Sequence, residues 1–512
     1  SLAEQLAIKA NRFERVFHAF HTYGTGLNAD LRVTDEAARA AIDTLALSDE
    51  PVSQAMEALD VGELIADFGK AAGLYGGVGI AADAYRYMVL RDEGAACSEV
   101  ETARSRVAAA LEVLHIATRI TGAEGVIVRA LANTNLPGAG QAATVPLFNE
   151  MGQPLPLEKN NGTWRTDQSG LYPDLIWEDS CSRDMYVGWA LAYAAVWEVI
   201  RTDSAFDDAL KLRLRTDAKM LVDSLMKVGA EGFDLEIMDA DGRVTYHGIM
   251  HEHAVDRVYI TNFPNGFNGL LAVGIVSALS YVSGDENQHD YLVRTLIDER
   301  GLLDLAQNSL LGLDLGPGSN FSGYNMAFTG AWLASRYLTR SEDRNLVRLT
   351  LREALYNRED ADRQPREQSQ ALYHLVFAQS ELGFFADGRD VVTPVNHLAE
   401  VMDNVRRDLD EFPHPPFFGR SVLNCDETEI ASLECVADDG TALPLLGTVG
   451  WNNDLIADVP VPMRLRPVSN YYWRSNPYAV NGETSERVLL PGSDFRWVYW
   501  GGRILYTQPS ND

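Results

Sequence analysis

Cysteine, lysine and long apolar runs are scarce in this chain of 512 residues, and each scarcity narrows the class of protein. Four cysteines occur, without the paired C-x-x-C spacing of a zinc site, so we do not expect metal binding through sulfur. No run of 18 apolar residues occurs, and we therefore do not expect an integral membrane protein. The G-x-S-x-G elbow and the kinase motifs are also missing, which argues against those enzyme classes.

Basic residues are too few to balance the acidic ones. The chain has 73 Asp and Glu against 43 Lys and Arg, a formal net charge of -30 at pH 7. Only six of the 43 basic residues are lysines. Such a surface repels polyanions, so we expect no nucleic-acid partner. Hydrophobic residues make up 46% of the chain, which is enough for a large buried core.

Two of the cysteines, Cys425 and Cys435, bracket a short acidic segment. A disulfide could close this segment if the protein is exported, because disulfides persist in oxidising compartments. Two buried thiols are the alternative. Our hypothesis for the location is periplasmic or extracellular. The chain begins with Ser1, which either a removed signal peptide or a trimmed terminus would explain.

Apolar residues recur at helical spacing through most of the chain, and the predicted helices come in consecutive pairs. The first member of several pairs is apolar on almost every side, as in residues 184–201, whereas its partner, here residues 206–228, carries charges on one side. This alternation predicts two concentric layers. The six predicted pairs are 4–22 with 34–59, 63–91 with 98–120, 184–201 with 206–228, 267–283 with 288–299, 325–339 with 342–357, and 367–383 with 394–410.

The fold class that we predict is all-α, an (α/α)6 toroid of about six helical hairpins formed by residues 1–410. Residues 122–178 lack helical periodicity and are expected to form a strand and loop insertion. Asp241-Gly242 predicts a hairpin turn between two strands. Residues 411–512 are rich in proline and aromatic residues and are expected to form an irregular or β extension packed on the toroid.

Several motifs in a fixed order carry a family resemblance. The first is similar to a W-x-D-x-S-x-D-x-x-x-G pattern, at Trp177, Asp179, Asp184 or its neighbours, and Gly188, with Cys181 in place of the serine. The others are DGRVTYHG at 241–248, NGFNGLLAVGIVSALSYVSGDE at 265–286, NFSGYNMAFTGAWL at 320–333, and NPY followed by W-G-x-R over 476–503. With these motifs the chain resembles the six-hairpin glycosidase-like proteins, and more narrowly a bacterial group of this architecture without an assigned activity.

In such a toroid the loops before the inner helices form a funnel where ligands are expected. Helix N-termini hold carboxylates ionised and oriented, and this chain places acids there repeatedly. Our candidate catalytic residues are Asp179 and Asp184 on one wall and Glu367 on another. The alternative is structural: Asp179 or Ser182 caps a helix, and Asp184 pairs with Arg183 or another arginine.

Aromatic and amide side chains near these acids suit a sugar, because aromatic faces stack on pyranose rings and amides bond to hydroxyls. A carbohydrate or another small molecule is therefore the expected partner. The candidate substrate-binding residues are Trp164, Trp177, Tyr186, His251, Asn320, Tyr324 and Arg366.

No metal or cofactor is expected. His247, His251 and His253 lie within seven residues and could ligate zinc, but their spacing fits no zinc motif, and binding or structural roles are the alternatives. Asp239 and Asp241 lack the later ligands of a calcium loop, so a turn is expected there.

The first functional hypothesis is an inverting glycoside hydrolase with paired carboxylates in the funnel. The second is a polysaccharide lyase in which Tyr324 or Tyr186 is the base and Asn320 or His251 stabilises the substrate carboxylate. An isomerase or hydro-lyase on the same fold is a third enzyme class. A non-catalytic glycan-binding or structural exported protein is the alternative to all three.

Overall fold

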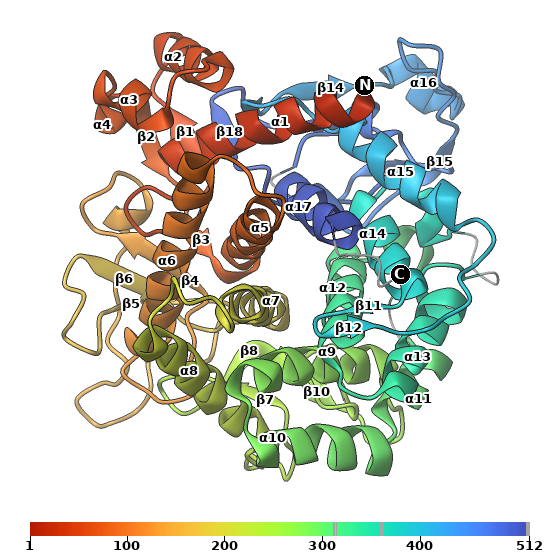
Figure 1. Cartoon of the computed structure of the whole chain (residues 1–512). Coiled ribbons are helices and arrows are strands. Elements are labelled where there is room, and N and C mark those ends of the chain that lie inside the picture. Colours follow the sequence, from red (N-terminus) through yellow and green to blue (C-terminus); the bar gives the residue numbers. More distant parts are fainter. Residues whose placement is uncertain (311–312, 314, 359–362, 470, 508–512) are drawn as a thin grey trace.

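The computed structural model describes residues 1–310, 313, 315–358, 363–469 and 471–507 (Figure 1). About 51% of the chain is helical and 12% is strand, distributed over several small sheets. The predicted all-α class is therefore wrong: helix and sheet are mixed. The prediction failed because the strands are two to six residues long, too short for alternation to stand out beside the helical periodicity.

Six helices pack side by side around the centre of the molecule (Figure 1). Each contacts the next in chain order, and the last contacts the first, so they close a ring. The C-terminal segment supplies the sixth helix, so part of the predicted extension belongs to this ring. The six are α5 (Gly73–Asp92), α7 (Arg183–Ile200), α9 (Gly266–Ser283), α12 (Phe321–Tyr337), α14 (Ala371–Leu382) and α17 (Ser493–Thr507).

Further helices cover the outside of the ring. α6 packs on α5, α8 on α9, and α15 on α14, which follows from the apolar stripe that each presents between its charged residues. The larger outer helices are α1 (Leu2–Val16), α2 (Glu36–Leu47), α6 (Cys97–Arg119), α8 (Asp208–Met226), α13 (Ser341–Thr350) and α15 (Leu398–Glu411). Shorter ones are α3 (Val52–Glu57), α4 (Val61–Leu64), α10 (Glu286–Asp290), α11 (Leu302–Asn308) and α16 (Glu427–Ser432).

Small residues set the spacing of the ring. α5 and α7 approach so closely that a Cβ on Gly77 would lie 2.1 Å from the carbonyl oxygen of Gly188. Glycine is therefore required at position 77 for this helix contact. α9 is long and apolar enough to pass a composition test for a membrane span, but 94% of it is buried inside the protein, as expected of a core helix.

Two four-stranded antiparallel sheets flank the first half of the ring. One joins distant segments in the order β13 (Phe417–Phe418), β18 (Val488–Leu490), β1 (Leu31–Val33) and β2 (Ile65–Phe68). The other has the order β3 (Ala71–Ala72), β4 (Ala130–Asn133), β6 (Leu175–Glu178) and β5 (Trp164–Thr166), and it contains the strands of the predicted insertion.

Five two-stranded hairpins or ribbons complete the strands of the described residues. The pair around Asp241-Gly242 forms as predicted, with Gly242 at φ +79°. The pairs are β7 (Glu236–Met238) with β8 (Val244–Ile249), β9 (Ala254–Val255) with β10 (Val258–Tyr259), β11 (Phe384–Phe385) with β12 (Gly388–Arg389), β14 (Ser421–Leu423) with β17 (Asn481–Glu483), and β15 (Leu445–Val449) with β16 (Leu455–Ala457).

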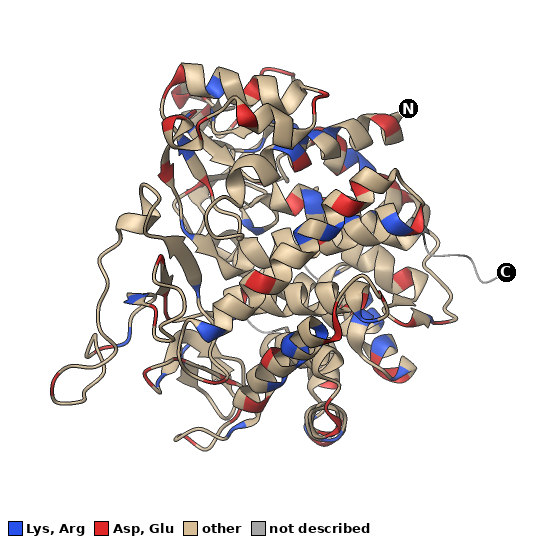
Figure 2. Ribbon diagram, turned by 60° about the vertical axis from the view of Figure 1, so that its left-hand side comes forward, with Lys and Arg blue, Asp and Glu red and all other residues tan. Residues whose placement is uncertain are grey.

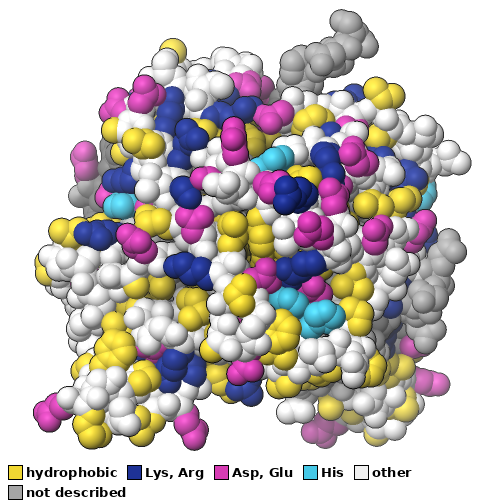
Figure 3. Space-filling model, turned by 90° about the horizontal axis from the view of Figure 1, so that it is seen from below, with side chains coloured by type: hydrophobic (Ala, Val, Ile, Leu, Met, Phe, Trp, Pro, Cys, Tyr) yellow, Lys and Arg dark blue, Asp and Glu magenta, His cyan; other side chains and the backbone are white. Residues whose placement is uncertain are grey.

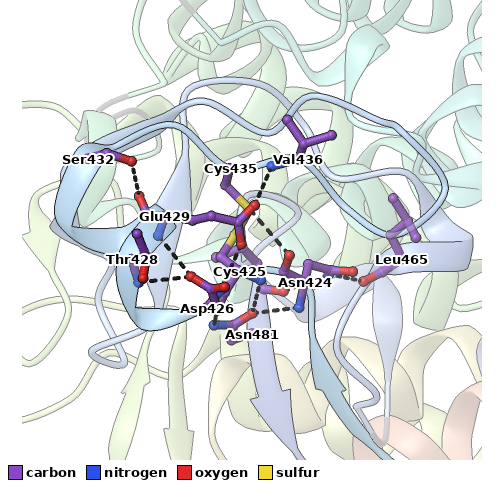
Figure 4. Close-up of a disulfide and its surroundings, with 11 residues drawn as sticks. Asn424, Cys425, Asp426, Thr428, Glu429, Ser432, Cys435, Val436, Leu465 and Asn481 are labelled. Atoms are coloured by element: carbon purple, nitrogen blue, oxygen red, sulfur yellow. Dashed lines mark hydrogen bonds between the residues drawn. A yellow bond between two sulfur atoms is a disulfide. The ribbon is translucent and has the colours of Figure 1, made fainter.

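A small separate core lies in the C-terminal segment. It contains a disulfide between Cys425 and Cys435, whose Cα atoms are 5.5 Å apart (Figure 4). Beside it the Asn481 side chain accepts hydrogen bonds from the backbone N–H groups of Asn424 and Cys425, at 2.8 and 3.1 Å. Of the two alternatives for these cysteines, the structure has the disulfide.

Acidic and basic residues are interspersed along the helices drawn in Figure 2. Figure 3 shows the molecule from below, the side on which α8 and α10 lie in Figure 1, and side chains of both charges are mixed there with apolar ones. This face has no broad basic surface.

Candidate functional site

The segment Tyr471–Arg474 joins the starts of four ring helices, α5, α12, α14 and α17, at one end of the ring. Arg474 Nε donates to Ser322 at the start of α12 at 2.8 Å, and its Nη1 donates to Tyr75 at the start of α5. The backbone N–H of Tyr472 donates to Asp494 of α17 at 2.7 Å, and its carbonyl accepts from the Gln370 side chain before α14. We call this end the mouth of the ring; a ligand funnel was expected there, and the C-terminal segment covers it in part.

Asp184 lies in the first turn of α7 at this end of the ring. Burial alone would raise the pKa of its carboxyl, but the charge of Arg474, the hydrogen bond from the Ser182 hydroxyl and the charge of Arg129 outweigh burial and lower the pKa. Arg183 bonds to Asn268 at 2.9 Å and to Asp256 at 3.4 Å, and so the alternative pairing of Asp184 with Arg183 is not observed. Asp184 is therefore an ionised carboxylate beside a cationic side chain.

A cavity of ≈ 190 Å³ adjoins Arg474. Its walls are mostly polar, with an exposed indole, Trp451, which is 65% accessible. Asp454 also lines the cavity, and burial raises the pKa of its carboxyl. The lining side chains include Asn320, Phe321, Ser322, Trp451, Asn452, Asp454, Ser469, Arg474 and Asn476. The cavity therefore combines an aromatic stacking surface, amide groups and one acid with a raised pKa. It adjoins the guanidinium of Arg474, whose charge lowers the pKa of Asp184.

Asp179, the other predicted acid on this wall, is 1% exposed and saturated with partners. Its carboxylate accepts from Arg165 at 2.7 and 3.0 Å and from the backbone N–H of Thr163 at 2.8 Å. Lys159 Nζ lies 3.3 Å away and also pairs with Asp239 at 2.5 Å and Asp241 at 3.4 Å. Because no side of the carboxylate is open to a substrate, the catalytic prediction for Asp179 is replaced by a structural role.

Glu367 and Arg366 form the short 3-10 turn Pro365–Glu367, and both are exposed. Arg366 lies 3.5 Å from Asn357, and the negative charge of Glu367 acts on the phenol of Tyr478. Tyr478 lies near Phe321, with 6.2 Å between ring centroids. Both residues therefore lie at the rim of the mouth, and no contact joins Glu367 to Asp184 within the described residues.

Three of the predicted sugar-stacking residues belong to the core instead. Trp177 is fully buried, and its indole N–H donates to the carbonyl of Thr166 at 3.0 Å. Tyr186 is 2% exposed, and burial raises the pKa of its phenol far above the ordinary value. Trp164 is partly buried in β5 and packs against the main core. Their sequence neighbourhood was polar, but strand and helix periodicity turned these side chains inward.

Asn320 and Tyr324 come from the start of α12. Asn320 caps the helix by accepting from the backbone N–H of Ser322 at 3.0 Å and also lines the cavity, as predicted for a binding residue. Tyr324 is 2% exposed and stacks on Phe321, with ring centroids 5.5 Å apart. Tyr324 therefore supports the wall and does not face a ligand.

His251 is buried in an ionic cluster outside the cavity. It lies 3.3 Å from Glu252 and 3.6 Å from Asp234, and Arg300 joins both acids. Burial lowers the pKa of its imidazole. The backbone carbonyl of His251 accepts a hydrogen bond from the Asn268 side chain of α9 at 2.9 Å. His251 thus holds the start of α9 through its backbone, and its imidazole does not face the mouth of the ring.

One group of side chains in the described chain has a geometry that could hold a metal ion: Glu14, His18 and Asp83. The guanidinium of Arg496 lies among them, 2.7 Å from Glu14 and 2.5 Å from Asp83. A fixed cation already neutralises these acids, and so the residues do not fit a metal site.

The sequence analysis missed Arg474, Tyr75, Asp454 and Trp451. The aromatic-rich stretch that holds Arg474 was visible, but its position over the ring depends on contacts with helices more than 100 residues away. Comparisons of the chain with family models, with curated proteins and with solved structures give no match.

Proposed function

We propose that the protein is a carbohydrate-active enzyme, a glycoside hydrolase whose site is the cavity beside Arg474. One observation carries the proposal: Asp454, whose pKa is raised by burial, lines the same cavity as Arg474, and the charge of Arg474 lowers the pKa of Asp184. Glycoside hydrolysis needs one acid that keeps its proton and one ionised carboxylate.

The roles follow from the two environments. Asp454 retains its proton to a higher pH and would protonate the leaving oxygen, while Asp184 is ionised and would activate water. Burial is the cause of the raised pKa of Asp454. Inversion, the outcome that we propose, requires the two carboxyl groups to lie about 6.5–9.5 Å apart with a water between them.

The cavity walls supply the recognition. The exposed face of Trp451 offers a stacking surface for a pyranose ring, and Asn320, Asn452 and Asn476 offer amide donors and acceptors for hydroxyl groups. Arg474 is held by Ser322 and Tyr75, so its guanidinium is oriented before a ligand arrives.

The test is a panel of neutral and acidic oligosaccharides incubated with the protein, with the products resolved by chromatography and by proton NMR. The proposal expects shortened oligosaccharides whose anomeric signal is inverted at first appearance. Products that absorb in the ultraviolet would instead establish a lyase. Binding without products would establish a glycan-binding protein, and neither binding nor products across the panel would contradict the proposal.

A further inference from the structure

A second cavity, of ≈ 530 Å³, lies away from the Arg474 site, where the N-terminal and C-terminal parts of the chain meet. Its walls come from α2, from the segment that follows α15 and includes β13, and from residues 464–468. Three arginines from these separate segments, Arg39, Arg420 and Arg464, line it. Convergence of guanidinium groups in one hollow is notable in a chain with a net charge of -30.

Two of these guanidinium groups are held without a carboxylate. Arg39 lies over the ring of Phe418, 4.5 Å from its centroid, and donates to the carbonyl of Glu486 at 3.1 Å. Arg420 donates to the carbonyl of Arg464 at 3.3 Å. Neither forms an ion pair within 4.0 Å in the described part of the chain, although the charge of Arg39 acts on Asp43 and Arg420 faces the phenol of Tyr472. Each guanidinium carries five N–H donors, so both retain donors for a further acceptor.

The third arginine differs, because its charge is already matched. Arg464 pairs with Asp439 at 2.8 Å and lies 3.8 Å from Glu411. Asp410 also borders the cavity, but Lys9 donates to its backbone carbonyl at 2.8 Å and faces its charge. Glu411 also lines the cavity. Arg39 and Arg420 are therefore the two lining guanidinium groups without an ion pair within 4.0 Å among the described residues.

We propose that this cavity binds an oxyanion group, a phosphate, a sulfate or the carboxylate of a sugar acid, between Arg39 and Arg420. The planar N–H fork of arginine matches the oxygens of these groups better than any other side chain does. The cavity is larger than one such group, so the anion is carried by a small molecule. This binding does not depend on the proposed hydrolase activity.

The experiment measures binding of sodium phosphate, sodium sulfate and sodium glucuronate by titration calorimetry, with glucose as the neutral control. Ionic strength is held constant with sodium chloride, so that screening is the same throughout. We expect at least one anion to bind with 1:1 stoichiometry. Arg39→Gln with Arg420→Gln should weaken that binding at least tenfold, and Arg420→Gln alone about threefold, since each guanidinium supplies part of the contact.

Arg104→Gln is the matched control, because Arg104 is on α6 and pairs with Glu101 on the protein surface. Its affinity for the anion should equal that of the unmodified protein. Arg420 is exposed and its side chain contacts the carbonyl of Arg464 and the phenol of Tyr472, so the single variant should fold even if the double variant does not. Preference for glucuronate would identify a sugar acid, and preference for phosphate or sulfate would identify those groups. No anion binding, or equal binding by Arg420→Gln, would overturn the proposal.

Discussion

Asp179 and Asp184 are five residues apart, flank the start of the same helix and have opposite environments. Asp179 is closed on every side by Arg165, Lys159 and a backbone N–H. Asp184 accepts from Ser182 and lies near Arg474, whose charge lowers the pKa of its carboxyl, beside the mouth of the ring. The difference teaches that the number of fixed partners, more than burial or position in a motif, distinguishes an acid that holds the fold from one that we propose for catalysis.

The largest expected effect is on turnover. Asp184→Asn should lower kcat about 10³-fold on any glycan that the protein cleaves, because the general base is lost while the side-chain shape is kept. Its free energy of unfolding should change by no more than ~1 kcal/mol. Initial rates and chemical denaturation on the same preparation measure both quantities. Unchanged kcat would remove Asp184 from the mechanism.

Asp179→Asn should lower the free energy of unfolding and leave kcat nearly unchanged, the reverse of Asp184→Asn. Removing this charge leaves the buried Arg165 guanidinium without an acid, whereas Lys159 keeps Asp239 and Asp241. An unpaired buried guanidinium costs about 3–5 kcal/mol of unfolding free energy. The kcat of the remaining folded protein should stay within about threefold of the original. Urea denaturation followed by far-ultraviolet circular dichroism gives the first value. A stable Asp179→Asn protein without activity would invert the comparison.

A third acid, Asp494 of α17, extends the comparison. It is fully buried, and backbone N–H groups contact its carboxyl group, whereas cationic side chains lie beside Asp179 and Asp184. Burial raises its pKa to about 7, and hydrogen bonds from the backbone N–H groups of Tyr472 and Phe495 offset this only in part. The folded pKa is above the ordinary value of 3.8, so the folded protein holds a proton that the unfolded chain has lost.

This stabilising contribution is complete below pH about 4 and is lost as the pH rises through about 7. The stability of the protein relative to Asp494→Asn should therefore fall by a few kcal/mol over this interval and level off above it. Denaturant midpoints of both proteins at several pH values measure the difference. A difference that is independent of pH would show that Asp494 does not carry the shift.

The smallest expected effect concerns the segment that carries Trp451 and Asp454. The disulfide closes a short loop between two cysteines that are ten positions apart in sequence, so Cys425→Ala with Cys435→Ala should cost about 2–3 kcal/mol. Cys97→Ala is the control, because Cys97 is free and exposed. Equal stability of all three proteins would mean that the disulfide does not constrain this segment.

Much of the helical part of the fold could be predicted from the sequence, since residues such as those of α7 and α9 are apolar around the whole helix and fix the buried layer. The fold class could not, because β3, β9 and β11 are two residues long and take their strand geometry from partners that local patterns do not reveal.

The same limit applies to the candidate site, where contacts between residues far apart in sequence could not be predicted from local patterns. Asp184 and Asn320 could be placed at helix starts because helix N-termini have local signals. Asp179 was assigned to catalysis because its partners Arg165 and Lys159, 14 and 20 residues away, cannot be connected to it by spacing. Arg474 was missed for the corresponding reason, as it contacts Tyr75 and Ser322 across most of the chain.

The most direct test of the central claim is a crystal structure of the Asp184→Asn protein with an oligosaccharide that the unmodified protein cleaves. The account predicts a sugar ring against Trp451, with the scissile oxygen near Asp454 and Arg474. A sugar bound at another surface, with the cavity beside Arg474 unchanged, would contradict it.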